Sequence, residues 1–406
     1  MKTLLYHLKY WYHFFKTGLL KGLPAAIRYG FPTRKLKIIA ITGTDGKTTS
    51  STLMYEVLKA AGKKAALLST VAAYIGTEQI ETGFHVTSPD AHDLQKLMAK
   101  MVKQKIKYLV LEFTSHGAYQ HRLWGIKPLI AGVTNVTHEH LDYHLTYENY
   151  VEAKAMILER AKIVVLNEDD QSFHRLKKYL TDHNRVVTYS VETPLPKKIR
   201  DAVEPKFPEL YNQMNARLVT KIATQLGINH QTIAQGIWNF QGVPGRMEFV
   251  PNKRGLKIVI DFAHTPNALE EALKALRRHM KTNHLTGRLI AVYGAAGLRD
   301  LTKRPLMGKV GVQYADLVVF TAEDPRTEDV WSIIRQMKEQ LVVGHNQVVS
   351  LGDREQAIHF AINHLARRGD LVAFFGKGPE KSMCYGTTEF PWSERAVVEQ
   401  ALAQKK

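Results

Sequence analysis

The feature that most constrains this chain is a glycine-containing loop that joins an apolar run to a helical pattern. The apolar, β-type run is 36–41, the helical pattern is 51–61, and the loop between them reads Thr42-Gly43-Thr44-Asp45-Gly46-Lys47-Thr48-Thr49. A strand that turns through glycines into a helix N-terminus directs several backbone N–H groups and the positive end of the helix dipole at one place. The loop therefore predicts an α/β fold that holds a nucleotide triphosphate.

Two side chains of the loop suit the same ligand. The Lys47 ammonium can reach terminal phosphates, and the Thr48 hydroxyl can bind magnesium. Ile41 stands where the full Walker A pattern has its first glycine, so the loop matches the shorter form Gly-Thr-x-Gly-Lys-Thr-Thr. A flexible turn without a ligand is the alternative, but this combination of residue types in this register argues against it. The residues expected to contact the nucleotide triphosphate here are Gly43, Thr44, Asp45, Gly46, Lys47, Thr48 and Thr49.

Short apolar runs alternate with helical patterns along the rest of the chain. They lie at 38–41, 108–113, 129–133, 163–166 and 186–189 and, after the turn-rich stretch 241–245, at 257–261, 288–293, 317–321, 347–350 and 371–375. Such alternation is typical of doubly wound, mostly parallel sheets with helices on both faces. The sequence therefore predicts a P-loop-type α/β domain at 37–243 and a second, Rossmann-like α/β domain at 244–406, after a basic segment at 1–36.

Composition limits the compartment and the partners. Cys384 is the only cysteine, so neither an internal disulfide nor a cysteine metal cluster is expected. No N-terminal run matches a signal peptide, and no run reaches transmembrane length, which predicts a cytoplasmic protein. The net charge of +18 indicates anionic partners. Because no nucleic-acid-binding motif accompanies this charge, we expect the protein to bind anionic small molecules or a membrane surface and no nucleic acid. We also expect a monomer.

The first 44 residues contain eight Lys or Arg and no Asp or Glu. An apolar stripe recurs there at helical spacing and consists of Leu4, Leu8, Trp11, Phe15 and Leu19. This pattern is typical of a basic amphipathic helix. Two interpretations stay open. The stripe either packs onto the nucleotide-binding domain, which we favour slightly, or residues 1–22 contact the anionic inner face of the membrane.

Further motifs follow the loop in a fixed order. They are Glu112-Phe-Thr-Ser-His116, Thr134-Asn-Val-Thr-His-Glu-His-Leu-Asp-Tyr-His144, Tyr150-Val-Glu-Ala-Lys154, Pro244-Gly-Arg-Met-Glu248, Asp261-Phe-Ala-His-Thr-Pro-Asn267, Asp324-Pro-Arg326 and Gly376-Lys-Gly-Pro-Glu380. The ordered set resembles the Mur ligase family, MurE type, whose members add the third residue of the peptidoglycan stem peptide to a UDP-N-acetylmuramoyl-dipeptide. The resemblance implies an ADP-forming amide ligase that uses ATP and magnesium. Such enzymes ordinarily carry a UDP-binding domain before the loop, and with only 42 residues ahead of Gly43 we expect that domain to be missing.

The resemblance also implies a catalytic centre. Its residues are Lys47, Glu112, His140 and Lys154, with Thr48, Glu112, His140 and Lys154 as magnesium ligands. Lys154 is implied to be carbamoylated, which converts a cation into a carboxylate-like ligand, although alone it would be interpreted as a surface lysine. Zinc is the rival interpretation of the histidine cluster 138–144. That cluster lacks the His-Glu-x-x-His spacing and follows a phosphate loop, which favours magnesium.

Substrate contacts are implied in the same way. The UDP-muramoyl peptide is assigned to Thr87, Ser88, Ser115, Gln120 and Arg122, the adenine to Asn215, and the remaining nucleotide contacts to Arg246, Asp261 and His264. Asp261 has an alternative role as a partner of a helix N-terminus. The incoming free amino acid is assigned to Arg299, Asp324, Arg326, Gly376 and Glu380.

Arg326 favours meso-diaminopimelate over lysine as the incoming amino acid, because lysine has no second carboxylate for the guanidinium to bind. Asp324 and Pro379 depart from the Asn and His of the family pattern.

Two other functions remain as alternatives. One is a Mur-like ligase of the folylpolyglutamate or cyanophycin type, and the other is a membrane-associated nucleotide-binding scaffold without catalysis. The joint presence of Lys47, Glu112, His140 and Lys154 argues against the scaffold.

Overall fold

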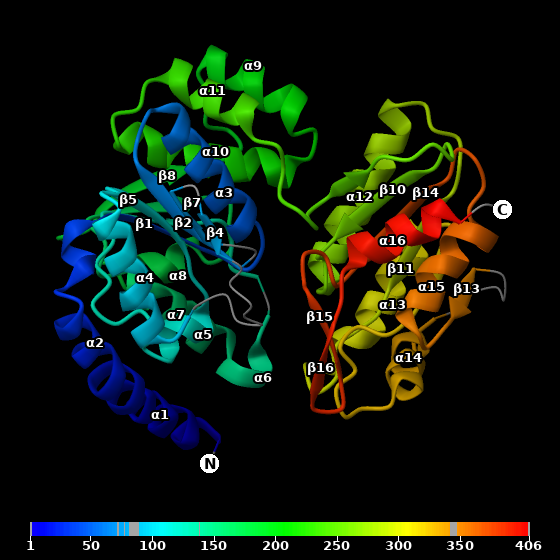
Figure 1. The fold of residues 1–406 in the computed structure, drawn as a ribbon, viewed down its shortest axis with the longest axis horizontal. Helices are drawn as coiled ribbons and strands as arrows, with labels where there is room; N and C mark the ends of the chain where they lie inside the picture. The colour runs from blue at the N-terminus through cyan, green and yellow to red at the C-terminus, as the bar shows by residue number, and fades with distance from the viewer. Residues whose placement is uncertain are drawn as a thin grey trace. The chain divides into compact units, whose positions relative to one another are not determined.

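The chain folds into two compact units, 1–241 and 242–406, in a computed structural model (Figure 1). The structure describes residues 2–70, 73–76, 78–80, 89–137, 139–341 and 347–404. Thr87 and Ser88 therefore lie outside the described residues.

The described strands of the first unit form one eight-stranded sheet in the order β4-β3-β2-β5-β1-β6-β7-β8. Neighbours from β2 to β8 are parallel, whereas β3 and β4 extend one edge in antiparallel pairing. The strands are β1 (Lys37–Thr42), β2 (Ala65–Leu68), β3 (Ala73–Ile75), β4 (Glu78–Ile80), β5 (Tyr108–Glu112), β6 (Ile130–Val133), β7 (Ile163–Asn167) and β8 (Arg185–Tyr189). The expected doubly wound sheet is confirmed.

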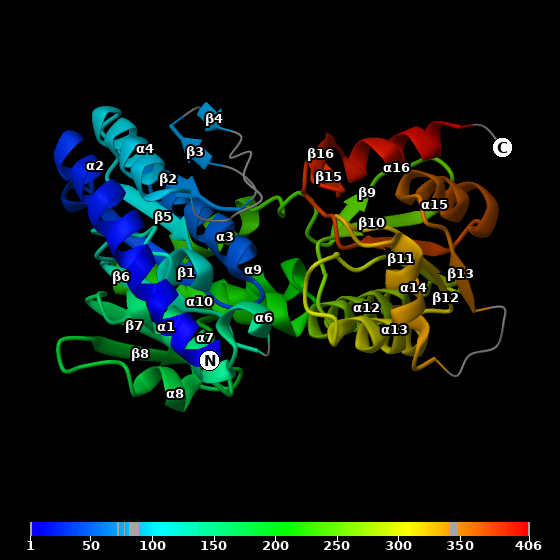
Figure 2. The same ribbon diagram turned by 90° about the horizontal axis from the view of Figure 1, so that it is seen from below.

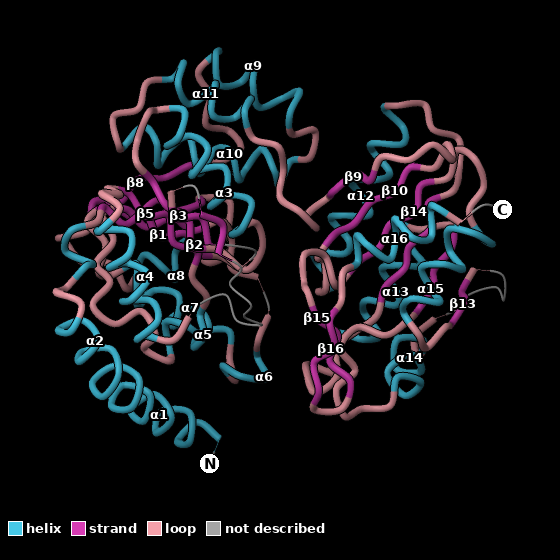
Figure 3. The backbone as a smooth tube through the Cα atoms, viewed as in Figure 1, coloured by secondary structure: helices cyan, strands magenta, loops and turns pink. Residues whose placement is uncertain are grey.

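Helices cover both faces of this sheet (Figure 3). They are α3 (Lys47–Ala60), α4 (Ala91–Lys103), α5 (Ser115–Tyr119), α6 (Leu141–His144), α7 (Tyr147–Leu158), α8 (Phe173–Lys177), α9 (Lys197–Lys206), α10 (Leu210–Gln225) and α11 (His230–Asn239). α3 packs with α10 and α11, while α4 and α7 share a core with Ile38 and Ala40 of β1. Because both faces are covered, β1 is buried at five consecutive positions. The loop 43–46 thus leaves a central strand at its carboxyl end, where doubly wound folds bind ligands.

The N-terminal segment is one continuous helical stretch on the outside of the first unit (Figure 1, Figure 2). It consists of α1 (Lys2–His13), the π-helical η1 (Phe14–Gly22) and α2 (Leu23–Arg28), and the 3-10 turn η2 (Pro32–Lys35) leads into β1. The residues on its inward face occur at every fourth position and are Tyr6, Tyr10, Phe14, Gly18 and Gly22. Steps of four drift around an α-helix, which has 3.6 residues per turn, and the wider π-helical turns offset that drift.

Four of the five side chains in the apolar stripe predicted from the sequence are exposed, and Leu19 is half-buried. Leu4 is 65% exposed, Leu8 and Trp11 are each 55% exposed, and Phe15 is 54% exposed. Our expectation that this stripe packs onto the nucleotide-binding domain was therefore wrong, although the helix does dock. The docking face depends on two glycines, where an added Cβ would lie 2.6 Å from the Trp124 side chain. Hydrophobic periodicity does not detect such a face, because its tightest contacts involve residues without side chains.

The second unit contains a six-stranded sheet in the order β13-β12-β11-β14-β10-β9, parallel except for β9. Its strands are β9 (Glu248–Val250), β10 (Lys257–Asp261), β11 (Leu289–Tyr293), β12 (Leu317–Phe320), β13 (Val348–Ser350) and β14 (Leu371–Phe375), and β15 (Ser382–Tyr385) pairs with β16 (Thr388–Pro391) as a separate hairpin.

The helices of this unit contribute to two cores on opposite faces of the sheet. α12 (Pro266–Thr282), α13 (Lys303–Tyr314) and α14 (Val330–Lys338) bury one face. The other face is covered by α15 (Arg354–Phe360), the π-helical η3 (Ala361–Leu365) and α16 (Glu394–Ala403). The expected second α/β sheet is confirmed.

Candidate ligase site

The phosphate-type loop depends on its two glycines. Gly46 has φ 78° at the N-terminus of α3, and a Cβ there would lie 2.3 Å from Asn215 Oδ1. A Cβ on Gly43 would lie 1.7 Å from Thr134 Oγ1. Asn135 braces the loop, because its carbonyl accepts from Thr44 N at 2.8 Å and its Oδ1 from Asp45 N at 3.0 Å. The sequence analysis gave Asn135 no role, although its position in the 134–144 motif was the available signal.

Glu112 and Thr48 lie side by side beneath the loop. Glu112 ends β5 and is 1% exposed, and its Oε1 accepts from Thr48 Oγ1 at 3.1 Å and from Thr70 Oγ1 at 2.9 Å. Thr70 N donates to the other carboxylate oxygen at 3.0 Å. A buried carboxylate surrounded by hydroxyl groups offers the hard oxygen donors that magnesium prefers. These residues therefore fit the metal that the loop implies.

Lys154 is fully enclosed next to the loop. It is 1% exposed, its Nζ donates to Gly43 O at 2.6 Å, and it lies 4.5 Å from the centre of the Tyr150 ring. Burial, and then the nearby Lys47 charge, hold the pKa of Lys154 well below its usual range. The structure thus buries Lys154 at a position that the sequence alone would assign to the surface.

The His140 ring also lies close to Tyr150, with ring centres 6.0 Å apart. Its backbone is left-handed, with φ 57°, at the start of α6, and its Nε2 is 3.7 Å from Glu139 Oε2. The Tyr150 hydroxyl in turn hydrogen-bonds Thr44 Oγ1 at 3.1 Å. One aromatic ring therefore connects the loop, Lys154 and His140. Among the side chains that the structure describes, no three His, Cys, Asp or Glu gather as a metal site.

Asn215 faces the loop from α10. Its Oδ1 accepts from Ser50 Oγ at 3.2 Å and its Nδ2 donates to Asn212 Oδ1 at 3.3 Å. These bonds hold the amide against the start of α3, next to Gly46. Asn215 therefore lies beside the glycine loop, and its role as an adenine contact stays a prediction.

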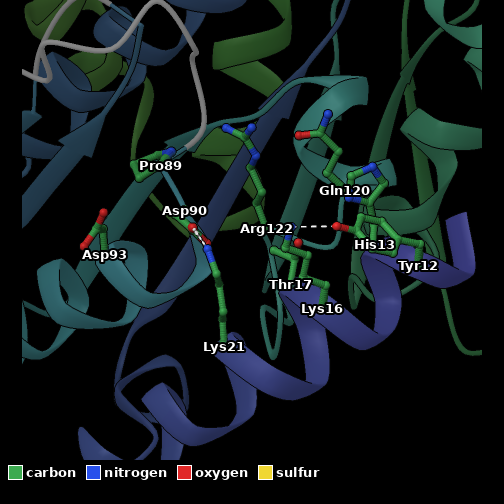
Figure 4. A pocket seen from close by; sticks show the side chains of 10 residues that line it. All are labelled: Tyr12, His13, Lys16, Thr17, Lys21, Pro89, Asp90, Asp93, Gln120 and Arg122. Carbon is green, nitrogen blue, oxygen red and sulfur yellow. Dashed lines mark hydrogen bonds and ion pairs between the residues drawn. The ribbon is translucent and has the colours of Figure 1, made fainter. Parts of the chain in front are cut away.

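A pocket of about 320 Å³ opens beside the N-terminal helix (Figure 4). Gln120 and Arg122 line it and extend in the same direction. The remaining lining residues are Tyr12, His13, Lys16, Thr17, Lys21, Pro89, Asp90 and Asp93. The Lys21 ammonium pairs with Asp90 at 2.7 Å, while Lys16 Nζ donates to the Tyr12 hydroxyl at 2.6 Å. The N-terminal helix is thus part of the pocket that holds two of the expected substrate residues.

Ser115 connects the same region to the helix through a buried histidine. Its hydroxyl hydrogen-bonds His144 Nε2 at 3.0 Å, and His144 Nδ1 hydrogen-bonds the Tyr6 hydroxyl at 2.9 Å. Burial, followed by the nearby imidazoles of His116 and His140, lowers the pKa of His144 to about 2, so this imidazole is neutral. Sequence analysis did not foresee Tyr6, since no motif includes it.

In the second unit, Asp261 ends β10 as a buried carboxylate. It accepts from Met247 N at 2.7 Å and from Ala263 N at 2.9 Å, while α12 is capped by Thr265 instead. Burial raises the pKa of Asp261, and Arg246 opposes that shift. The Arg246 guanidinium lies 4.3 Å from the centre of the Phe262 ring, and His264 Nδ1 lies 3.0 Å from Phe262 O. The three expected nucleotide contacts of this unit therefore surround one strand end.

Asp324 and Glu380, two of the residues assigned to the incoming amino acid, contact a buried lysine to which the sequence analysis gave no role. Lys377 Nζ is 2.8 Å from Asp324 Oδ1 and 2.5 Å from Glu380 Oε2. Gly376 lies against Glu323, because a Cβ there would be 2.9 Å from Glu323 Oε2. Asp324 is thus neutralised by an internal cation, which explains how an aspartate is tolerated in a buried position.

Arg326 is half-buried next to this cluster, with φ 54°. Its Nη1 donates to Gly297 O at 2.6 Å, and its N–H donates to Cys384 O at 3.0 Å. Arg299 lies on the loop after β11 and is exposed. The hydrogen bond to Gly297 O positions the guanidinium of Arg326, and the bond to Cys384 O positions its backbone. Arg299 is exposed on its loop instead.

Family models match both units. Residues 41–222 match the Mur ligase middle domain, and residues 245–378 match the glutamate ligase domain of Mur ligases. The chain belongs to the Mur ligase family. Among the described residues of this Mur ligase, no helix has the length and apolarity needed to cross a membrane.

Its relatives include two enzymes named UDP-N-acetylmuramoyl-L-alanyl-D-glutamate–2,6-diaminopimelate ligase. The one from Clostridium botulinum is 37% identical over 398 residues, covering 93% of this chain and 80% of the relative. The one from Geobacillus thermodenitrificans is 34% identical, with 93% and 81% coverage. A solved structure of a ligase with that name is 29% identical and superposes with a TM-score of 0.58, covering 93% of this chain and 81% of the other.

Proposed function

We propose that this Mur ligase joins meso-diaminopimelate to UDP-N-acetylmuramoyl-L-alanyl-D-glutamate at the expense of ATP. The observation that carries the proposal is the similarity to ligases of that name along 93% of the chain. The buried Thr48–Glu112 pair below a glycine loop supports it, because an ATP-driven ligase needs a phosphate cradle and oxygen ligands for magnesium.

The reaction divides into two transfers. A carboxylate oxygen of the acyl substrate attacks the γ-phosphorus of ATP, so that ADP leaves and an acyl phosphate forms. The acceptor amine then attacks the acyl carbon, loses a proton, and expels phosphate as the amide forms. Lys47 lies at the start of α3, where its charge opposes that of the transferred phosphoryl group. When bound, magnesium neutralises further charge on the phosphate oxygens, and Thr48, Glu112 and His140 are the side chains that we assign to it.

We assign Lys154 the role of a carbamoylated ligand in the same centre. Carbon dioxide reacts with the neutral form of an amine, and the lowered pKa of the buried Lys154 shifts its equilibrium toward that form. A buried ammonium beside Lys47 and a metal would be repelled by both, whereas a carbamate places an anion there. In that form Lys154 would no longer need its hydrogen bond to Gly43 O and would offer carboxylate-like oxygens to the metal.

The acyl substrate is assigned to the pocket that contains Gln120 and Arg122, with Ser115 behind it. The guanidinium of Arg122 can bind two oxygens of a carboxylate or diphosphate. Asn215, Arg246, Asp261 and His264 are assigned to the nucleotide, and Arg326 to the distal carboxylate of the incoming amino acid.

The acceptor preference gives a measurable prediction. Wild-type kcat/KM should be higher for meso-diaminopimelate than for L-lysine by about ten- to a hundredfold. This ratio corresponds to the free energy that a hydrogen bond to a charged group usually contributes. Arg326→Ala should remove most of this difference by lowering the diaminopimelate value alone. Arg335→Ala is the matched control, because that side chain is exposed on α14 of the same unit and is assigned no role in the site. A wild-type preference for lysine would contradict the assignment and indicate Asp324 as an ammonium partner.

The overall activity is tested by following phosphate release with UDP-muramoyl peptides of different lengths and a panel of amino acids. We expect release only with the dipeptide form and a diamino acid. Release with a folate or a cyanophycin-type peptide instead would assign the chain to another branch of the family.

A further inference from the structure

The N-terminal helix has an apolar face that no described part of the first unit covers. Its largest exposed side chains are Leu4, Leu8, Trp11, Phe15 and Leu20, which are 54–73% exposed. They project opposite the docking face of Tyr6, Gly18 and Gly22. Contiguous exposed apolar side chains on a soluble fold mark an interaction surface.

The helix is held in place by its other face, so this exposure does not depend on a loose chain end. Tyr6 hydrogen-bonds the buried His144 at 2.9 Å and stacks on Tyr119 with ring centres 4.6 Å apart. The Trp124 indole covers Gly18 and Gly22. Because these contacts use the inward face, the apolar face can bind a partner without undocking.

Charge identifies the kind of partner. Residues 1–44 contain eight Lys or Arg and no acidic residue. Lys9 and Lys16 are exposed on the same helix, whereas Lys21 pairs with Asp90 at 2.7 Å. A second copy of this chain would bring an equal positive charge to the interface. An anionic lipid surface can bind both kinds of side chain. The apolar side chains insert among the acyl chains, the basic side chains are attracted to the anionic headgroups, and Trp and Tyr favour the boundary between these two layers.

We propose that residues 4–20 bind the surface of an anionic membrane while the helix stays docked on the ligase. The helix then lies in the plane of the headgroups. Tyr12, His13 and Lys16 of the same helix line the pocket with Gln120 and Arg122, so the pocket opens beside the lipid surface. This consequence rests on the proposed function of that pocket, whereas the lipid contact itself does not.

Co-sedimentation of the full chain with vesicles tests the proposal. Binding is expected to phosphatidylglycerol-containing vesicles, to be much weaker with phosphatidylcholine alone, and to fall at high salt. The double variant Leu8→Glu, Trp11→Glu should bind roughly tenfold or more weakly. Lys9→Gln should weaken binding about fivefold, the contribution of one basic residue near the surface.

The matched control is Trp238→Glu, because Trp238 is 49% exposed on α11 of the same unit. It should bind vesicles like wild type. Thermal stability and turnover without vesicles should stay unchanged in Leu8→Glu, Trp11→Glu, which separates failure of the lipid contact from failure of the ligase function.

Three results would overturn the proposal. They are absence of binding to anionic vesicles, equal binding by the double variant and wild type, and a concentration-dependent dimer that the double variant disrupts. The last result would assign the apolar face to a second copy of the chain.

Discussion

Lys47→Ala and Glu112→Gln are each expected to abolish acceptor-dependent ADP formation. The first removes the cation that opposes charge on the transferred phosphoryl group. The second replaces one anionic oxygen of the Thr48–Glu112 pair with an amide nitrogen, which cannot ligate magnesium. Losses of a catalytic charge partner commonly reduce kcat on the order of a hundred- to a thousandfold. Coupled detection of ADP, with and without the amino acid, measures the effect.

Two side chains of α3 provide matched controls. Lys59 and Glu56 form a surface ion pair at 3.0 Å on the same helix, so Lys59→Ala and Glu56→Gln make the same chemical changes away from the loop. Both should keep wild-type turnover, because an exposed ion pair contributes little to stability. Near-full activity of Lys47→Ala or Glu112→Gln would show that the phosphate site is assigned to the wrong residues.

Lys154→Ala should also be nearly inactive, and added short-chain carboxylates should restore part of its activity. A small carboxylate can occupy the space of the deleted side chain and supply the anion that the carbamate provides. We expect a loss on the order of a hundredfold or more. Lys154→Arg is the informative companion, because its guanidinium stays charged and cannot be carbamoylated.

Carbamoylation has a direct readout besides activity. Burial lowers the pKa of Lys154, so its amine should lose its proton at a lower pH than the amine of a surface lysine. Lys154 should therefore also react with carbon dioxide at a lower pH. With carbon-labelled bicarbonate, NMR should show one carbamate signal in wild type that Lys154→Arg lacks. Full activity of folded Lys154→Ala, verified by thermal denaturation, would remove the carbamate from the mechanism.

The sheets were predictable because their strands are continuous apolar runs. All ten runs chosen from the sequence are strands, including β1 and β14. The four-residue strand β2 was missed, as were β3, β4 and β9, since runs of three or four residues carry no distinct pattern. The hairpin β15–β16 was missed because β16 is exposed at every position.

The site was predictable where its residues follow predicted neighbouring strands. Loop residues and Glu112 lie together because they end adjacent parallel strands. Long-range contacts were not predictable. The bond between Tyr6 and His144 joins residues 138 positions apart, and Lys377 gains its role only by burial beside Asp324. The inward face of the N-terminal helix was misjudged because glycines, and not large apolar residues, permit its close packing.

The most direct test of the account is phosphate release by the purified full chain with UDP-N-acetylmuramoyl-L-alanyl-D-glutamate, ATP and magnesium. Release should require meso-diaminopimelate and yield a tripeptide product whose mass equals the sum of both substrates minus water. The Glu112→Gln variant should give neither phosphate nor product. ATP hydrolysis without amide formation, or no dependence on the UDP-muramoyl dipeptide, would contradict the proposal that this Mur ligase adds the third stem-peptide residue.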